Sequence, residues 1–391
     1  MAFKNQMVIQ ALVVLSFIAR PAGLLAQVPK ANGIVSNDRA VTAIVDHAAE
    51  SFFKNTPQAV GLSIGVVKGG KTYTYNYGTV ERDKKAPPTA NTLYPIASIT
   101  KTFTGALLAQ AALEGKIKLD DNVGKYLDGD YPNLEFQAHP VRLFDLLDHR
   151  SGLPFFIPDR PETQPDFENN VVPWPTRIAN IERTYTRQDF YSDLHKVKLD
   201  AVPGEKFRYS NAGAMLAGYI LEHLYGTPYE ALLRKKIFGP LDMRATTITL
   251  SPAQVSRTAN GYDEKGILMP DNPNELQAAG AIKSTVNDML KYAKWNLEEA
   301  DEAVRLSHKP VLTSGPYAAG LNWQEMNGDG RRVIWQEGNI VGFNAFCIVE
   351  PELKIGLIIF ANEEDPASAH RQSVLANEIL TGLDPKSVLM P

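Results

Sequence analysis

The chain has 391 residues, of which 44% are hydrophobic and 21% charged, and its formal net charge is −4. This composition is that of a folded globular protein, and the length allows about two or three domains. The mildly acidic balance, without a block of basic residues, argues against nucleic acid as a partner.

The first 26 residues predict a secretory signal. Lys4 precedes the apolar run 7–19, which suits a signal and is too short to span a bilayer. We expect cleavage after Ala26, with Ala22 as the alternative site, because Leu24 fits the small-residue rule poorly. The sequence therefore predicts a periplasmic or secreted protein, with peripheral attachment to a membrane if the signal stays uncleaved.

Residues 37–54 show the apolar spacing of a helix, and the runs 59–67 and 71–80 predict a β-hairpin with its turn at Gly69-Gly70. The segment 61–65 matches the G-x-S-x-G pattern of a nucleophile elbow, but an elbow requires a helix directly after the strand. A second strand follows here, so Ser63 is predicted to be a strand residue.

The segment Ser98-Ile99-Thr100-Lys101 opens an apolar helix that is expected to end at Gly115. Residues at i and i+3 share a helix face, so the Lys101 amine can lie beside the Ser98 hydroxyl. The helix start also favours developing negative charge. The spacing alone is not decisive, because Ser51-Phe52-Phe53-Lys54 repeats it in an amphipathic helix, where we expect a structural role.

Residues 141–147 predict a short helix that ends before Gly152 and Pro154. His149 at its end can be a base, but a histidine there more often caps carbonyl groups. The run 154–175 holds six prolines and several aromatic residues. It predicts a long loop, either a wall of the active site or a packed surface loop.

Tyr209-Ser210-Asn211 precedes a helix expected over 214–224. Two further helices are expected, over 228–237 and from Lys283 to Leu297, and the segment 245–280 between them is rich in loops. The end of the chain predicts strands at 332–335, 343–349 and 354–360, followed by a helix over 367–380. The only cysteine, Cys347, lies in the second of these strands, so no disulfide within the chain is possible and no thiolate metal cluster is expected.

The pattern predicts an α+β fold in which the N-terminal hairpin and the C-terminal strands share one antiparallel sheet, flanked by the terminal helices. Residues 27–90 and 281–391 would form this sheet domain, and residues 91–280 a mainly helical domain. The active site is expected between the two.

Three features stand in a fixed order along the chain: Ser98-x-x-Lys101, Tyr209-x-Asn211, and Gln336-Glu337-Gly338 followed by Gly342-Phe343. This order resembles the serine β-lactamase and penicillin-binding-protein superfamily, in particular its class C branch. That branch also holds D-alanyl-D-alanine carboxypeptidases, D-amino-acid peptidases and β-lactamase-like esterases. The segments 146–154, 203–211 and 238–243 are similar to other recurrent stretches of the branch, so the resemblance covers nearly all of the chain after residue 26.

The resemblance implies a serine hydrolase that works through an acyl-enzyme and needs no metal or cofactor. Ser98 would be the nucleophile, with either Lys101 or Tyr209 as its base. Asn211 would bind Lys101 and a substrate carbonyl group. The backbone N–H groups of Ser98 and Asn339 would form the oxyanion hole.

The third motif departs from the usual Lys-Thr-Gly or His-x-Gly, because Gln336 stands at the Lys or His position and Glu337 adds a negative charge. Loss of the charged contact to a substrate carboxylate would weaken binding about 10- to 100-fold. We therefore expect weak β-lactam turnover and a preference for esters or amides without that carboxylate.

Other interpretations stay open. The protein can be a carboxylesterase with little β-lactamase activity, or a catalytically inactive protein of the penicillin-binding type. A conventional Ser-His-Asp hydrolase using Ser63 or His149 fits the pattern poorly. The expected partner is a small-molecule or peptidoglycan-type substrate, and the expected state is a monomer.

Overall fold

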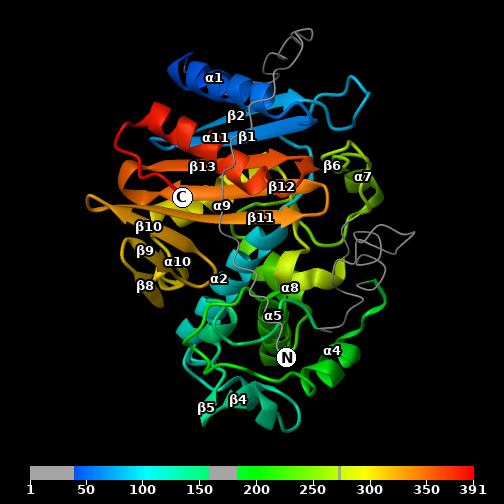
Figure 1. Cartoon of the computed structure of the whole chain (residues 1–391), viewed down its shortest axis with the longest axis vertical. Helices are drawn as coiled ribbons and strands as arrows, with labels where there is room; N and C mark the ends of the chain where they lie inside the picture. Colours follow the sequence, from blue (N-terminus) through cyan, green and yellow to red (C-terminus); the bar gives the residue numbers. More distant parts are fainter. Residues whose placement is uncertain (1–38, 158–182, 272–273) are drawn as a thin grey trace, which may run out of the picture.

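The computed structural model describes residues 39–157, 183–271 and 274–391. Its centre is an eight-stranded antiparallel sheet in the order β2-β1-β13-β12-β11-β10-β9-β8 (Figure 1). The strands are β1 (Gly61–Lys68), β2 (Lys71–Gly78), β8 (Leu312–Ser314), β9 (Tyr317–Ala319), β10 (Gln324–Gly328), β11 (Arg331–Ile340), β12 (Phe343–Glu350) and β13 (Ile355–Ala361). The two ends of the chain thus share one sheet, as the sequence predicts.

The register of the sheet joins residues from opposite ends of the chain. In the N-terminal hairpin, Lys68 lies opposite Lys71, and Gly69 and Gly70 supply the two positive φ angles of the turn. β1 then pairs with β13, with Leu62 opposite Ala361. β12 and β13 are buried along their whole length, because helices cover both faces of the sheet.

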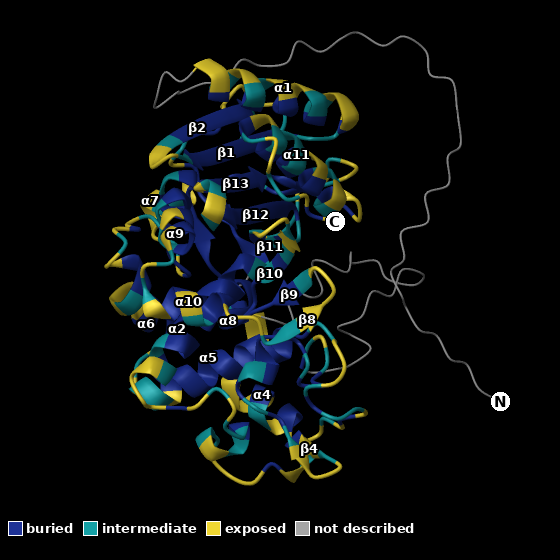
Figure 2. Ribbon diagram, turned by 90° about the vertical axis from the view of Figure 1, so that its left-hand side faces the viewer, coloured by how far each residue is buried: buried dark blue, intermediate teal, exposed yellow. Residues whose placement is uncertain are grey.

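Helices α1 (Arg39–Asn55) and α11 (Ser368–Leu383) pack on one face of the sheet, and α9 (Val286–Glu298) packs on the other (Figure 1). The apolar side of α1 follows the predicted helical spacing and meets α11 and the outer face of β1 and β2. A second and larger core lies on the α9 side and continues into the helices below the sheet (Figure 2).

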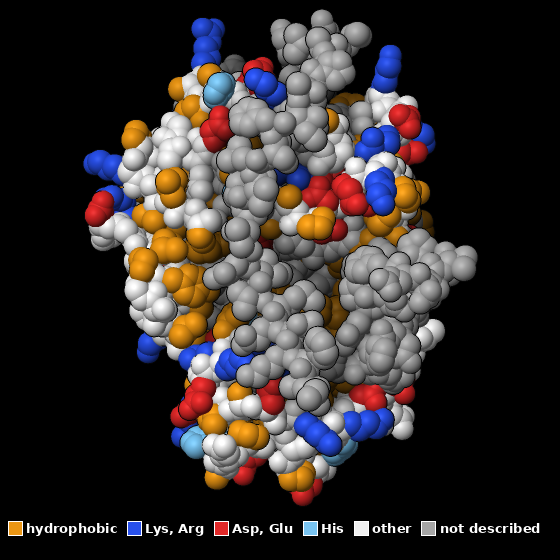
Figure 3. All heavy atoms as spheres, viewed as in Figure 1, with side chains coloured by type: hydrophobic (Ala, Val, Ile, Leu, Met, Phe, Trp, Pro, Cys, Tyr) orange, Lys and Arg blue, Asp and Glu red, His pale blue; other side chains and the backbone are white. Residues whose placement is uncertain are grey.

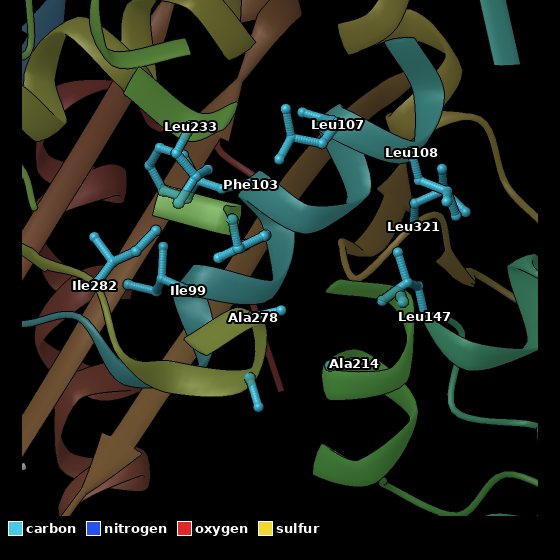
Figure 4. Packing of buried hydrophobic residues seen from close by; sticks show 14 of the residues in the cluster. Ile99, Phe103, Leu107, Leu108, Leu147, Ala214, Leu233, Ala278, Ile282 and Leu321 are labelled. Carbon is cyan, nitrogen blue, oxygen red and sulfur yellow. The ribbon is translucent and has the colours of Figure 1, made fainter. Parts of the chain in front are cut away.

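Helix α2 (Thr100–Leu113) is the centre of that larger core, and it is buried on almost every side (Figures 2 and 4). Phe103 stacks on Tyr292 of α9, with ring centroids 3.8 Å apart. Gly105 lies so close to the chain at Leu321 that a Cβ would come within 2.5 Å of the Leu321 carbonyl oxygen. The helix ends with Gly115 at φ +71°, as predicted.

The remaining helices surround α2 or lie beyond it. α5 (Asn211–Tyr225), α8 (Gln277–Gly280) and α10 (Glu302–His308) contact α2 directly. The others are α4 (Arg187–Leu194), α6 (Tyr229–Leu233) with a π-helical continuation (Arg234–Phe238), and α7 (Pro252–Val255). Two short antiparallel strands, β3 (Tyr94–Pro95) and β7 (Lys283–Ser284), join the start of α2 to the start of α9. The domain boundaries expected near residues 90 and 280 stay predictions.

Several predicted elements differ from the structure. The helix expected over 141–147 is only a 3₁₀ turn, Phe144–Leu146, at whose start the Asp145 carboxylate accepts from the backbone and guanidinium of Arg142, and His149 with φ +63° prevents its continuation. Strands β8 to β10 and helix α10 had no prediction, since their short and partly polar runs carry little periodicity. The strand predicted over 332–335 extends to Ile340.

Some predictions fall outside the described residues: the signal segment 1–26 and residues 158–175 of the proline-rich loop. Across the parts of the chain that the structure describes, none of the helices combines the length and apolar character needed to cross a membrane. On the face shown in Figure 3, the Lys and Arg side chains of the described residues are interspersed with Asp and Glu.

Candidate active site

Ser98 lies in a 3₁₀ turn, Ala97–Ile99, directly before α2 begins at Thr100. The sequence predicted Ser98 as the first residue of the α-helix, whereas it lies in the 3₁₀ turn that precedes the helix. The chain enters from β3 in extended form, and Ile96 N–H then donates to the Ile282 carbonyl at 3.0 Å. Ala97 has φ +46°, a costly backbone angle for a residue with a side chain. Ser98 follows it and is half-buried at the start of the buried helix.

Lys101 lies one turn further and is fully buried, with 0% exposure. Its Nζ is 2.9 Å from the Ser98 Oγ and donates to the Ala279 carbonyl of α8 at 2.6 Å. The predicted contact across three residues is therefore formed. Burial lowers the pKa of Lys101 well below its ordinary value, which favours the neutral amine.

Tyr209 approaches Ser98 from the other side, in the loop just before α5. Its hydroxyl donates to the Ser98 Oγ at 2.6 Å, and the Lys101 Nζ lies 5.0 Å from the centre of its ring. Burial raises the pKa of Tyr209, and the negative charge of Glu337 raises it further, while the Ser98 contact opposes the shift. Tyr209 is thus held as the neutral phenol, a proton donor beside a lysine that is held neutral.

His149 supports Tyr209 rather than capping carbonyl groups, which corrects the expectation from the sequence. Its ring centroid lies 4.1 Å from that of Tyr209, and its Nδ1 accepts the Ser210 N–H at 3.2 Å. Burial and the nearby Lys101 lower the pKa of His149 to about 3. An imidazole that is neutral and accepts at Nδ1 carries its proton on Nε2.

Asn211 is the first residue of α5, and Ser210 caps the helix by accepting the Gly213 N–H at 2.9 Å. The side-chain contact expected between Asn211 and Lys101 is not among the hydrogen bonds of the described residues, where Lys101 reaches Ala279 instead. The Asn211 N–H donates to the Phe155 carbonyl at 2.9 Å. The described start of the proline-rich loop therefore lies against the site.

Two aromatic side chains form a rim beside Tyr209. Phe155 and Phe207 are 52% and 54% exposed, which is unusual for side chains of this size. The Phe155 ring lies 5.9 Å from the Tyr209 ring, and Phe207 meets His149 edge-on at 5.8 Å. They offer an apolar surface at the approach to Ser98.

The far half of β11 lies beside the Ser98 turn. β10 pairs with β11 only as far as Trp335, so within the described residues 336–340 are paired on one edge alone. Gly338 packs directly on the turn, where a Cβ would lie 2.3 Å from the Ile96 carbonyl oxygen and 3.1 Å from the Ser98 nitrogen. Only glycine fits this contact, which explains the glycine of the third motif.

The neighbours of Gly338 have different environments. Gln336 is 4% exposed, and its amide donates to the Glu337 carbonyl at 3.1 Å. Asn339 is exposed, and its side-chain oxygen accepts from the Asn344 amide. Glu337 is half-buried, and burial raises the pKa of its carboxyl group. No ion pair or hydrogen bond engages that carboxylate within the described parts of the chain.

The structure thus gathers Ser98, Lys101 and Tyr209 in direct contact, with Gly338 against the serine turn. Reasoning from the sequence missed Ala279, whose contribution is a backbone carbonyl, and it missed the support that His149 gives to Tyr209. For Ala279 the only signal was the small-residue run 278–281, which permits close approach to α2.

Other candidates from the sequence lie elsewhere. Ser63 is in the middle of β1, fully buried, and donates to the Asn76 side chain at 2.9 Å, so it is a strand residue as predicted. Cys347 is buried in β12. Among the residues that the structure describes, no three His, Cys, Asp or Glu side chains gather as a metal site.

A family model described as Beta-lactamase matches residues 40–380. A β-lactamase of Pseudomonas fluorescens is 26% identical over 392 residues, which cover 88% of this chain and 99% of that protein. Among solved structures, a β-lactamase/D-alanine carboxypeptidase from Yersinia pestis, complexed with citrate, is similar with a TM-score of 0.76 at 26% identity and covers 89% of this chain and 99% of its own. A class C β-lactamase at 23% identity, with a TM-score of 0.75 over 90% of this chain and 99% of its own, has the same fold.

Proposed function

The chain belongs to the β-lactamase family, and on that premise we propose that it is a serine hydrolase that forms an acyl-enzyme on Ser98. The observation that carries the proposal is the position of the Ser98 Oγ, 2.9 Å from the Lys101 Nζ and 2.6 Å from the Tyr209 hydroxyl. A nucleophile, a buried amine and a phenol in mutual contact are the groups that acyl transfer needs.

In this proposal neutral Lys101 is the base. It accepts the proton of Ser98 as the Oγ attacks the carbonyl carbon, and a C–O bond forms while the carbonyl becomes an oxyanion. The lowered pKa of Lys101 and the raised pKa of Tyr209 support this choice over a Tyr209 phenolate. The backbone N–H groups of Ser98 and Asn339 are assigned to the oxyanion, because Gly338 brings β11 against the serine turn.

Tyr209 is assigned the second proton transfer. Its phenol donates a proton to the leaving amine or alkoxide as the bond to the acyl carbon breaks, and it regains a proton from Lys101. A water molecule, deprotonated by the same pair, then attacks the acyl-enzyme and releases Ser98. His149 is a positioning residue here, since it packs against the Tyr209 ring and fixes the loop through Ser210.

For the substrate we propose esters or amides that lack a carboxylate beside the reacting bond, with little turnover of β-lactams. Gln336 is buried and uncharged where a lysine or histidine would bind that carboxylate, and Glu337 adds a negative charge beside it. We further propose export to the periplasm or the medium and a monomeric state, from the signal-like segment at 1–26 and the ordinary surface composition.

The test is covalent labelling of the purified chain. A fluorophosphonate should add to Ser98, located by mass spectrometry, and Ser98→Ala should abolish the adduct. Labelled penicillin should add slowly or not at all. Labelling at any other residue, or by neither reagent, would contradict the mechanism and favour a binding protein. Rapid hydrolysis of a chromogenic cephalosporin would instead overturn the proposed substrate preference.

A further inference from the structure

Glu337 lies at the edge of the Ser98 site, near enough for its negative charge to act on the Tyr209 hydroxyl. It precedes Gly338, which touches the Ser98 turn, and it belongs to the half of β11 that has a free edge. Its side chain is half-buried and engages no cation among the described residues. A partly buried carboxylate without a partner is costly, and a bound cation would offset that cost.

The other groups at the site do not neutralise this charge. Lys101 is buried and directed to Ser98 and Ala279, where burial favours the uncharged amine. Tyr209 and His149 are both held neutral by burial. Gln336 is uncharged. None of these four groups pairs with the Glu337 carboxylate.

The aromatic rim also attracts cations. Phe155 beside Tyr209 and Phe207 beside His149 each expose about half of their surface, and the faces of aromatic rings attract cations, quaternary ammonium groups in particular. Glu337 and the Phe155 ring are both neighbours of Tyr209, and a carboxylate and an aromatic face are the groups that bind an organic cation.

We propose that Glu337 selects substrates whose leaving group carries a positive charge, so that the enzyme prefers cationic esters and amides over neutral and anionic ones. This inference rests on the proposed acyl-enzyme at Ser98. With a thioester, the Ser98 Oγ forms the new bond to the acyl carbon, the C–S bond breaks, and the thiol leaves with the proton from Tyr209. Water then hydrolyses the acyl-enzyme and yields the carboxylic acid.

The experiment compares three thioesters with one acyl group: butyrylthiocholine as the cation, S-(3,3-dimethylbutyl) thiobutyrate as its neutral isostere, and S-butyryl thioglycolate as the anion. Released thiol is measured with a chromogenic disulfide, to which the buried Cys347 is inaccessible. The intact chain should show kcat/KM about tenfold higher for the cation than for the isostere, and lowest for the anion.

The readout is the ratio of kcat/KM between two substrates of the same variant. A loss of activity that a Glu337 substitution causes through Tyr209 affects both substrates and cancels in this ratio. Glu337→Gln should bring the cation-to-isostere ratio to about one, and Glu337→Lys should reverse the order. Asp329→Asn is the matched control, because it removes one carboxylate from the far turn of the β10–β11 hairpin, where Asp329 is exposed with φ +50° and asparagine fits. Its ratio should equal that of the intact chain.

Failure of this inference differs from failure of the mechanism. Turnover that requires Ser98 but shows no cation preference, or a preference that survives Glu337→Gln, overturns the inference alone. Fluorophosphonate labelling of Ser98 without cleavage of any thioester also overturns it. Turnover that persists in Ser98→Ala contradicts the proposed acyl-enzyme itself.

Discussion

Two segments of the chain have the same Ser-x-x-Lys spacing and different environments. In α1, Ser51 is half-buried, and Lys54 lies in the last turn of the helix, exposed to water. At the head of α2, Lys101 is fully buried and touches both Ser98 and the Ala279 carbonyl. The comparison teaches that the chemistry of the pair comes from burial, which lowers the pKa of Lys101, and from the neighbours that converge on Ser98.

Removal of the serine hydroxyl should give the largest difference in activity between the two segments. Ser98→Ala should lower kcat/KM for a nitrophenyl ester by about 10⁴-fold or more, because the nucleophile is lost. Ser51→Ala should leave it within about twofold, since surface changes of this kind are usually small. Steady-state kinetics checks both, and residual turnover above about a tenth in Ser98→Ala would refute the assignment.

Replacement of each lysine by methionine should also distinguish the two segments. At Lys101 it should lower the activity and raise the stability. Lys101→Met should lower kcat/KM about 10³-fold through loss of the base. It should also raise the free energy of unfolding by about 0.5–2 kcal/mol, because a buried amine is costly and active-site residues often destabilise the fold. Lys54→Met should change neither. Denaturant unfolding and ester kinetics measure the two effects, and a destabilised Lys101→Met would speak against the buried neutral amine.

The pH dependence follows from the direction of the Lys101 shift. Only the deprotonated amine is a base, so kcat/KM should fall as the pH falls through the lowered pKa of Lys101. Between that pKa and the ordinary value near 10.4, the unfolded chain binds more protons than the folded one, so stability should rise with pH over this window. The stability gap between Lys101→Met and the parent should therefore narrow toward high pH. A pH–rate profile and unfolding curves at several pH values test both.

The segment Tyr131-Pro132-Asn133 repeats the Tyr-x-Asn spacing of Tyr209-Ser210-Asn211, and the two copies give a smaller contrast. Tyr209→Phe removes the hydroxyl that touches Ser98 and should lower kcat/KM about 10²-fold, with a larger loss for amides, whose leaving groups need the proton more. Tyr131→Phe keeps the stacking of that ring on His195 and should have no effect on turnover. Equal losses for a nitrophenyl ester and an anilide would argue against Tyr209 as the proton donor.

Two glycines of the same hairpin give the smallest contrast. Gly338→Ala should place a methyl group on the Ile96 carbonyl oxygen, displace the serine turn, and cost about 1–3 kcal/mol of stability. Gly328→Ala meets only ordinary contacts with Val388 at 3.5 Å and should cost less than about 1 kcal/mol. Thermal unfolding of both variants gives the comparison, and equal melting temperatures would show that the turn tolerates a side chain.

The sequence predicts those features that depend on neighbours along the chain. The hairpin turn at Gly69-Gly70, the end of α2 at Gly115 and the Ser98–Lys101 contact all arise within a few residues. The order of the three motifs is enough to identify the family and the α+β fold. The 3₁₀ turn at Phe144–Leu146 was not predictable from periodicity, because the left-handed φ of His149, which ends it, leaves no mark in the apolar spacing.

The parts of the site that the sequence missed depend on distant backbone. Ala279 contributes a carbonyl group, and its side chain gives no sign of that role. The strained φ of Ala97 and the close approach of Gly338 arise from packing between β11 and the serine turn. The hydrogen bond expected between Asn211 and Lys101 is not among those of the described residues, where the amine donates to the Ala279 carbonyl of α8.

The pairing of β1 with β13 has a consequence for the synthesis of the chain. Leu62 emerges from the ribosome long before its partner Ala361. Until then the N-terminal hairpin keeps an open edge, and strand pairing over such a separation is slow. The sheet therefore cannot be completed before β13 has been synthesised. A chain truncated before β13 would retain every residue that touches Ser98 and still have no site.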